Sequence, residues 1–404
     1  MTSTDSPADG LTALRALLAL AVVFVMLATT GWTTLHRPDD EPSARAAALA
    51  LWATATIDGR RLPAADAPAA GIGRFFGSLT GPQRNLLADR YPLVVGNLGG
   101  APVSLRYRAN RRAIGQARAE EQRQSGNFRL SPADRDAAAR RAHRYRSLLD
   151  PERRILAFDP AGGGRIAEVF GDLDRAERVS VIVPGVDTDL LTFERTQRRY
   201  TAPVGMSEAL YDAERATAPT VRTAVIAWAD YTSPVGVGMD AATGRLASEG
   251  AVRLAALTAA LPGRSTVALF CHSYGSVVCG VAAHRLPARV TDIAVAGSPG
   301  MRAGSAADLE TSAQVWAMRD QGDWIADVPY MELGGVGHGA DPVSPSFGAR
   351  RLASTGAQGH TGYFTPGTTS LDNFARIGVG AYGSVVCAAG ENACWSGISG
   401  TDGA

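Results

Sequence analysis

The sequence predicts an α/β fold: a mostly parallel sheet with helices on both faces, preceded by a helical segment and an N-terminal transmembrane helix. From residue 155 onward, short apolar runs alternate with segments of helical composition. The runs are continuously apolar, as expected for parallel strands that are buried on both faces. An uncharged apolar stretch near the amino terminus predicts the membrane span.

The charge of the chain is close to balance, because 40 lysines and arginines oppose 39 aspartates and glutamates among 404 residues. This balance gives no electrostatic reason to expect nucleic acid as a partner. A hydrophobic content of 46% is ample for a large core. The four cysteines include no C-x-x-C pair, so we expect no structural zinc site. We expect no metal and no cofactor.

Residues 16–35 carry no charge. At about 1.5 Å per residue they are long enough to cross the hydrocarbon layer of a bilayer. A cleaved signal peptide is the alternative, but no good small-x-small cleavage site follows the stretch. We therefore expect a short tail over 1–10 and a signal anchor over 11–35, which makes the protein single-pass in the cell membrane. The large domain is then expected on the extracytoplasmic side.

Composition divides the remainder of the chain into four parts. They are a tether over 36–70, a helical N-terminal segment over 71–150, the α/β domain over 151–385 and a C-terminal tail over 386–404. In the helical segment, Thr80 and Gln83 have the spacing of a capping box. In the tail, Cys387 and Cys394 close a short loop, and a disulfide between them is expected if the domain is exported. Two unpaired small residues are the alternative.

The α/β domain is expected to open with a hairpin and to continue with alternating strands and helices. Strands are predicted at 155–159, 165–170, 179–183, 221–228, 266–271, 290–296 and 313–318, and helices at 190–197, 207–215, 246–261 and 276–286. The glycines at 162–164 turn the first strand into the second. They do not form a phosphate-binding loop, because no helix with Lys-Ser/Thr follows them.

The segment Cys271-His272-Ser273-Tyr274-Gly275 lies between a predicted strand and a predicted helix. It is nearly the G-x-S-x-G turn that exposes a nucleophilic serine, in which small residues let the strand and the helix approach each other. A cysteine in place of the first glycine is small enough to fit. The alternative is a serine that only caps the helix. Cys271 itself is a poor candidate nucleophile, because its side chain is expected to point into the core.

A nucleophilic serine needs a base and an acid, and on such a sheet the chain order is serine, acid, histidine. His360 is the last histidine and lies in a glycine-flanked loop, so we expect it to be the base, with His338 as the alternative. Asp323 follows the last predicted strand and is the expected acid, with Asp320 as the alternative. The acid would hold the imidazole in the correct tautomer.

An oxyanion hole requires two backbone N–H groups directed at the developing negative charge. The amide of Tyr274, directly after the serine, is expected to supply one. The second is expected from Val186, in the turn after the strand at 179–183, where Gly185 permits close backbone approach. The alternative for this turn is a plain strand ending.

With these residues in place, the chain resembles a poorly characterised α/β-hydrolase family, widespread in actinobacteria and formerly classed as a domain of unknown function. The similarity runs from about residue 75 to residue 381. Its most specific motifs are Gly96-Asn97-Leu98, Arg108-Ala109-Asn110, Val183-Pro184-Gly185, His272-Ser273-Tyr274-Gly275-Ser276, Gly322-Asp323, Gly337-His338-Gly339-Ala340-Asp341-Pro342 and Gly359-His360. The resemblance implies an α/β-hydrolase fold of the esterase and cutinase-like kind, with Ser273, Asp323 and His360 in the triad positions. Family members usually have glycine where Cys271 stands.

Two functions follow as hypotheses. The first is a membrane-anchored serine hydrolase that cleaves carboxylic esters, from small molecules or lipids, through a Ser-His-Asp triad and an acyl-enzyme. Thioesterase and peptidase activities stay open within this class. The second is a catalytically silent α/β-hydrolase fold that acts as a binding or scaffolding module at the cell envelope, and the altered first glycine motivates it.

Overall fold

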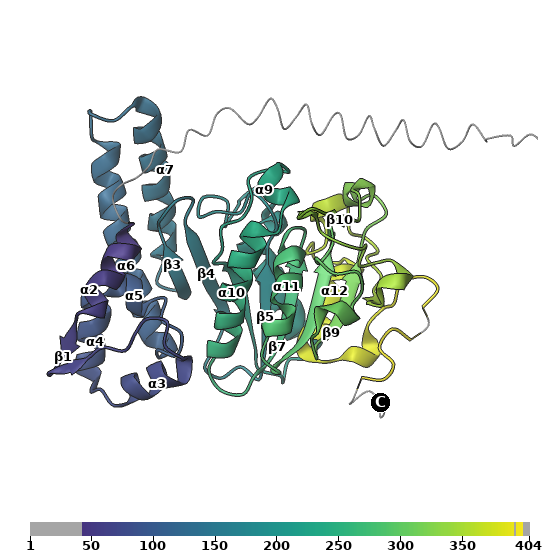
Figure 1. Cartoon of the computed structure of the whole chain (residues 1–404), viewed down its shortest axis with the longest axis horizontal. Helices are drawn as coiled ribbons and strands as arrows, with labels where there is room; N and C mark the ends of the chain where they lie inside the picture. Colours follow the sequence, from purple (N-terminus) through teal and green to yellow (C-terminus); the bar gives the residue numbers. More distant parts are fainter. Residues whose placement is uncertain (1–42, 392, 399–404) are drawn as a thin grey trace, which may run out of the picture. The chain divides into compact units, whose positions relative to one another are not determined.

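The computed structural model describes residues 43–391 and 393–398. Within these residues, an eight-stranded sheet has the strand order β12-β9-β8-β7-β5-β6-β4-β3 (Figure 1). The strands are β3 (Ile155–Asp159), β4 (Arg165–Gly171), β5 (Arg178–Val183), β6 (Thr223–Ala229), β7 (Thr266–His272), β8 (Val290–Ala296), β9 (Gln314–Met318) and β12 (Arg350–Arg351). The strands from β12 to β6 pair in parallel, whereas β4 and β3 are antiparallel. The predicted mostly parallel sheet and its opening hairpin are therefore confirmed.

Helices cover both faces of the sheet. They are α8 (Pro203–Thr217), α10 (Arg245–Ala260), α11 (Gly275–Ala282) and α12 (Thr369–Val379). The helices α10 and α11 share one hydrophobic core with Leu269 of β7. The helices α8 and α12 share a second core with Phe270, the next residue of the same strand. Because alternate residues enter opposite cores, β7 must be apolar along its whole length.

A helical region precedes the sheet. Its elements are α2 (Ala44–Ala53), β1 (Thr56–Ile57), β2 (Arg60–Arg61), α3 (Ala69–Gly77), α4 (Gly81–Arg90), α5 (Pro92–Val95), α6 (Val103–Ser125) and α7 (Pro132–Leu148). The predicted capping box is confirmed at the start of α4, where Thr80 and Gln83 exchange hydrogen bonds. Trp52 of α2 and Ile57 of β1 are buried in the core of this region. Residues 43–70, predicted as part of a tether, therefore fold into α2, a small hairpin and the start of α3.

Side chains of the helical region cover the outer edge of β3, which is one of the two edge strands of the sheet. The Asn97 amide group donates to the Phe158 carbonyl at 2.8 Å and accepts from the Phe158 N–H at 3.0 Å. The Asn110 amide donates to the Ile155 carbonyl at 2.9 Å, and Arg106 donates to the carbonyl of the next residue. An edge strand offers unpaired N–H and C=O groups to other chains. The helical region satisfies these groups within the chain.

The helix predicted at 190–197 is wrong. This segment consists of turns, although Leu190 and Phe193 are buried. The Asp189 carboxylate accepts hydrogen bonds from the amides of Leu191 and Thr192, both at 2.8 Å. Such an aspartate could cap a helix, but the carbonyls of Leu191 and Glu194 accept from the Arg144 side chain and the Phe193 carbonyl accepts from the Val204 amide. These carbonyls are bonded outside the segment instead of to the amides four residues on, as a helix requires.

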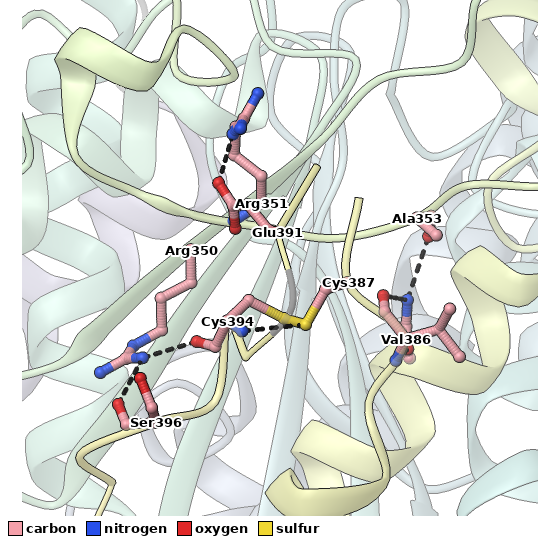
Figure 2. Close-up of a disulfide and its surroundings, with 9 residues drawn as sticks. Arg350, Arg351, Ala353, Val386, Cys387, Glu391, Cys394 and Ser396 are labelled. Carbon is pink, nitrogen blue, oxygen red and sulfur yellow. Dashed lines mark hydrogen bonds and ion pairs between the residues drawn. A yellow bond between two sulfur atoms is a disulfide. The ribbon is translucent and has the colours of Figure 1, made fainter. Parts of the chain in front are cut away.

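The described part of the predicted C-terminal tail is attached to the sheet. Cys387 and Cys394 form a disulfide (Figure 2). Arg350 of β12 donates to the carbonyls of Cys394 and Ser396, and Arg351 pairs with Glu391. These contacts explain why the chain after residue 385 remains packed against the end of the sheet.

The predicted tail at 1–10, the anchor at 11–35 and the first part of the tether lie outside the described residues. Among the residues that the structure describes, no helix is both long and apolar enough to cross a bilayer.

The side chain of Glu214, a residue of α8, is buried beside Gly378 of α12 and Ser180 of β5. Burial raises the pKa of Glu214 from its ordinary value of 4.5 to about 8. Its Oε1 accepts from the Ser180 hydroxyl, whereas its Oε2 has no hydrogen-bond partner among the described residues. Between pH 4.5 and pH 8 the folded chain keeps Glu214 protonated, whereas the unfolded chain ionises it. The free energy of unfolding therefore falls as pH rises across this window. At pH 7 it is about 3 kcal/mol lower than its value below pH 4.5.

We expect Glu214→Gln to remove this pH dependence, because glutamine has a similar shape and does not ionise. Urea unfolding measured at pH 5 and at pH 8 should give a smaller loss of unfolding free energy for the variant than for the wild type. Glu249→Gln, at an exposed position of α10, is the control and should leave the wild-type pH dependence intact. Equal pH dependence in wild type and Glu214→Gln would contradict this account.

Candidate active site

Ser273 occupies the sharp turn between β7 and α11. Its φ of 54° lies in the left-handed region, which costs an ordinary residue roughly 1–2 kcal/mol. Two glycines make room for the turn. A Cβ at Gly275 would lie 2.1 Å from the Val183 carbonyl oxygen, and a Cβ at Gly185 would lie 2.7 Å from the Ser273 Cβ. The turn thus has the geometry of a nucleophile elbow.

A disulfide spans this elbow. Cys271, the last residue but one of β7, is bonded to Cys279 of α11, and both residues are buried. From the sequence, Cys271 is expected to be a small residue in a glycine position and a poor nucleophile, and its pairing with Cys279 is not predicted. The signal was present, because Cys279 follows it by eight residues on the predicted helix. Since a disulfide sulfur carries no thiol, Cys271 is not a nucleophile in this state.

The structure brings Ser273, His360 and Asp323 together. The His360 Nε2 lies 2.8 Å from the Ser273 Oγ, and its Nδ1 lies 2.8 Å from the Asp323 Oδ1. An ionised carboxylate only accepts hydrogen bonds, so the Nδ1 carries the proton and the Nε2 is free to accept from the serine hydroxyl. Ser273 and Asp323 are buried and His360 is mostly buried. In this tautomer the imidazole can take a proton from the hydroxyl.

Three donors surround the Asp323 carboxylate. Besides His360, the Ile325 amide donates to Oδ1 at 2.9 Å and the Tyr363 hydroxyl donates to Oδ2 at 2.6 Å. Burial alone would raise the pKa of Asp323, but these hydrogen bonds outweigh burial, and the pKa lies below its usual value. The carboxylate is therefore ionised at neutral pH and can stabilise a positive charge on the imidazole.

The two alternative residues have other contacts. Asp320 accepts from the amides of Gly322 and Gly359, at 3.0 and 2.9 Å, and so fixes the turn directly before His360. The His338 Nε2 donates to the Ala241 carbonyl at 2.7 Å. Neither residue hydrogen-bonds within the Ser273–His360–Asp323 chain. Asp320 supports the loop that carries the imidazole, a contact that strand and loop positions alone do not predict.

His272 was not assigned a role from the sequence. Its Nε2–H donates to the His360 carbonyl at 2.6 Å, and the two rings lie 5.0 Å apart. Burial and, to a lesser extent, the neighbouring His360 lower the pKa of His272 to about 4. His272 is therefore a neutral ring that ties the backbone of His360 to the end of β7.

A cavity of about 190 Å³ opens above the serine and is lined by Gly185, Val186, Ser273 and His360, among others. Neither the Val186 amide nor the Tyr274 amide donates to another atom of residues 43–391 and 393–398. Both N–H groups are therefore available beside Ser273, as an oxyanion hole requires. A larger cavity of about 480 Å³ lies between β9 and the C-terminal loop and contains none of these groups.

The sheet order, the elbow and the histidine-bearing loop before α12 define an α/β-hydrolase fold. Residues 159–333 match a family described as alpha/beta hydrolase, in agreement with the resemblance inferred from the sequence. Among curated proteins, the chain is similar to uncharacterized proteins from two strains of Mycobacterium tuberculosis, CDC 1551 and H37Rv. Each alignment is 27% identical over 383 residues and covers 79% of this chain and 57% of the relative. The chain thus spans little more than half the length of these relatives.

Solved structures with some likeness include an α/β serine hydrolase without a lid from Xanthomonas campestris. It is 18% identical, with 44% of this chain and 75% of that chain covered and a TM-score of 0.26. A carboxylesterase from Lactobacillus plantarum is 16% identical, with 42% and 70% covered and a TM-score of 0.21. At such low TM-scores neither structure adds to the fold or to the site described above.

We expect the disulfide at the elbow to hold Ser273 in its strained conformation. The double variant Cys271→Ala/Cys279→Ala should lose about 2–3 kcal/mol of unfolding free energy, the loop-closure value for so short a loop, and should react more slowly with a fluorophosphonate probe. The variant Cys387→Ala/Cys394→Ala is the control, because the disulfide that it removes closes a loop of nearly the same length. It should lose similar stability with unchanged probe reactivity. Equal reactivity of both variants would show that the elbow does not need its disulfide.

His272→Leu should lower kcat about tenfold with little change in KM, because the His360 carbonyl loses its donor and the imidazole loses its fixed position. An unsatisfied buried polar group costs about 1–3 kcal/mol, and roughly 1.4 kcal/mol in the activation barrier changes the rate tenfold. His272→Gln, which restores an N–H donor, should recover part of kcat. A loss confined to thermal stability, with normal kcat in the folded fraction, would mean that His272 is only structural.

Proposed function

We propose that this protein is a serine hydrolase that cleaves carboxylic esters, held at the membrane by its N-terminal apolar segment with the catalytic domain outside the cytoplasm. The observation that carries the catalytic part is the His360 ring, whose two nitrogens lie 2.8 Å from the Ser273 hydroxyl and 2.8 Å from the Asp323 carboxylate. Hydroxyl oxygen is a weak nucleophile at neutral pH, and an adjacent oriented base activates it.

In the proposed first half-reaction, the Ser273 Oγ attacks the ester carbonyl carbon as its proton passes to the His360 Nε2. The carbonyl electron pair moves to the oxygen, and the amides of Val186 and Tyr274 stabilise that charge. Asp323 stabilises the imidazolium. The intermediate then collapses, the bond to the alcohol oxygen breaks, and the Nε2 proton goes to the departing alcohol.

In the second half-reaction, water attacks the acyl-Ser273 carbonyl and gives a proton to the His360 Nε2. Collapse of the second intermediate releases the carboxylic acid and returns the proton to the Ser273 Oγ. The cavity of about 190 Å³ is smaller than the roughly 300–1,000 Å³ of drug-sized ligand sites. It therefore suits the ester group and a short part of the acyl chain.

The alternative of a catalytically silent binding module receives no support from the site geometry. A histidine too far from the serine would have favoured it, whereas the observed separation is within hydrogen-bond reach. The substitution of the first elbow glycine by Cys271, which motivated the alternative, is accommodated by the disulfide to Cys279.

A fluorophosphonate probe should label the wild type on Ser273, and p-nitrophenyl esters of increasing chain length should be hydrolysed. Ser273→Ala should abolish labelling and lower ester hydrolysis about 10⁴-fold or more, as in other serine hydrolases. Thioester and peptide substrates measured in parallel would separate the esterase from the thioesterase and peptidase activities. Ser305→Ala, on a loop away from the cavity, is the control. A folded wild type that neither reacts with the probe nor hydrolyses any of these substrates would overturn the proposal.

A further inference from the structure

Exposed apolar side chains are concentrated on two loops. Twelve large hydrophobic side chains are exposed among the residues that the structure describes, and seven of them lie within residues 235–239 and 324–336. They are Val235, Val237, Met239, Trp324, Met331, Leu333 and Val336, which we call the apolar rim. Val235 and Leu333 are 87% and 80% exposed. Such a concentration is unlike the scattered single residues of an ordinary surface and marks a contact site.

The two loops adjoin each other and the site. Val336 forms a β-bridge with Thr243, directly after the short helix α9 (Met239–Ala242). Figure 1 accordingly draws α9 and β10 (Glu332–Leu333) beyond the same end of the sheet. The Gly236 amide donates to Asp187 at 2.7 Å, next to the Val186 amide. On the other side, the Trp324 ring lies 4.7 Å from the His360 ring. The apolar rim therefore borders the mouth of the cavity above Ser273.

The charges beside the apolar rim favour a lipid surface over an oppositely charged protein. The acidic side chains on the two loops, on α9 and on the neighbouring turn form ion pairs or hydrogen bonds. The exposed Asp327 is the exception. The pairs are Glu332 with Arg302, Asp240 with Arg245, and Asp187 with the Gly236 amide. Arg195 and Arg198 line the cavity, are exposed, and have no side-chain partner within residues 43–391 and 393–398. Free guanidinium groups in a cavity whose mouth is bordered by apolar side chains suit the phosphates of a bilayer interface.

We propose that the apolar rim binds a lipid bilayer, so that the cavity opens onto membrane lipids. The occupant is the bilayer because the exposed apolar side chains border a cavity that two unpaired arginines line, and because the uncharged residues 16–35 are predicted to keep the domain at a membrane. Resting on the proposed function, the substrate is then an ester of a lipid. Its carbonyl enters the small cavity while the remaining chain lies along the rim.

The binding is tested without catalysis, in the full-length Ser273→Ala protein reconstituted into vesicles of equal parts phosphatidylcholine and phosphatidylglycerol. All four native cysteines are in disulfides, so a fluorophore can be attached to a new cysteine at Leu333→Cys. Leu86→Cys, at an exposed apolar position of the helical region, is the matched control. Doxyl-labelled lipid should quench the Leu333 label about threefold more than the Leu86 label.

Equal quenching at the two positions would overturn the proposal. So would shielding of the Leu333 label that depends on protein concentration in detergent, because a second copy of the chain would then cover the rim. Arg195→Gln/Arg198→Gln should reduce quenching in vesicles with phosphatidylglycerol more than in pure phosphatidylcholine. An equal effect in both kinds of vesicle would show that Arg195 and Arg198 are not part of the lipid-binding surface.

The substrate part is tested in the active full-length protein. Val237→Ser/Leu333→Ser should lower hydrolysis of a long-chain ester embedded in vesicles about tenfold, since each serine forfeits the burial of an apolar side chain. Hydrolysis of soluble p-nitrophenyl butyrate should not change, and Leu86→Ser should change neither activity. Equal loss on both substrates would contradict the lipid assignment. If the Leu333 label is quenched but the protein hydrolyses no ester, the bilayer contact would be supported and the proposed hydrolase function would be wrong.

Discussion

The left-handed backbone of Ser273 is the constraint on which the site depends. A serine at φ 54° persists only where its surroundings hold it. Here Gly275 allows the backbone of α11 to approach Val183, Gly185 allows the neighbouring turn to approach the serine itself, and the Cys271–Cys279 bond ties the strand to the helix. The same turn leaves Val186 in the lining of the cavity at Ser273 and the Tyr274 amide directly after the serine in the chain.

Several hydrogen bonds likewise hold the His360 imidazole in place. His272 binds the carbonyl of His360, Asp320 binds the amide of Gly359, and Asp323 binds the ring itself. These contacts come from the ends of β7 and β9, so the loop before α12 is held by two strands of the same sheet edge. Hydrogen bonds that already exist in the free protein need no reorganisation when charge develops on the ring.

The sequence predicts the sheet well because strands buried on two faces are mostly apolar, and β5 to β9 are mostly apolar in spite of the buried Ser180 and Asp292. It also predicts which serine, histidine and aspartate come together, since chain order and strand ends restrict the choice. It does not predict the bond between Cys271 and Cys279, because the pairing depends on how α11 lies against β7. The helix predicted at 190–197 fails because the carbonyls of Leu191 and Glu194 bind the Arg144 side chain, a contact with a distant part of the chain that the local sequence does not show. The roles of His272 and Asp320 are contacts between loops, which periodicity does not record.

The hydrogen bonds from Asn97, Arg106 and Asn110 to β3 have a consequence for where the protein can be cut. The segment that matches the family begins at residue 159, yet the backbone of β3 depends on side chains more than forty residues earlier in the chain. A fragment trimmed to the matched segment would lack β3 and leave β4 as a bare edge strand, and one trimmed to start at β3 would expose the bare edge of β3. Exposed edges of this kind recruit neighbouring chains and promote aggregation. The smallest soluble unit is therefore expected to begin before α5, well ahead of the hydrolase signature.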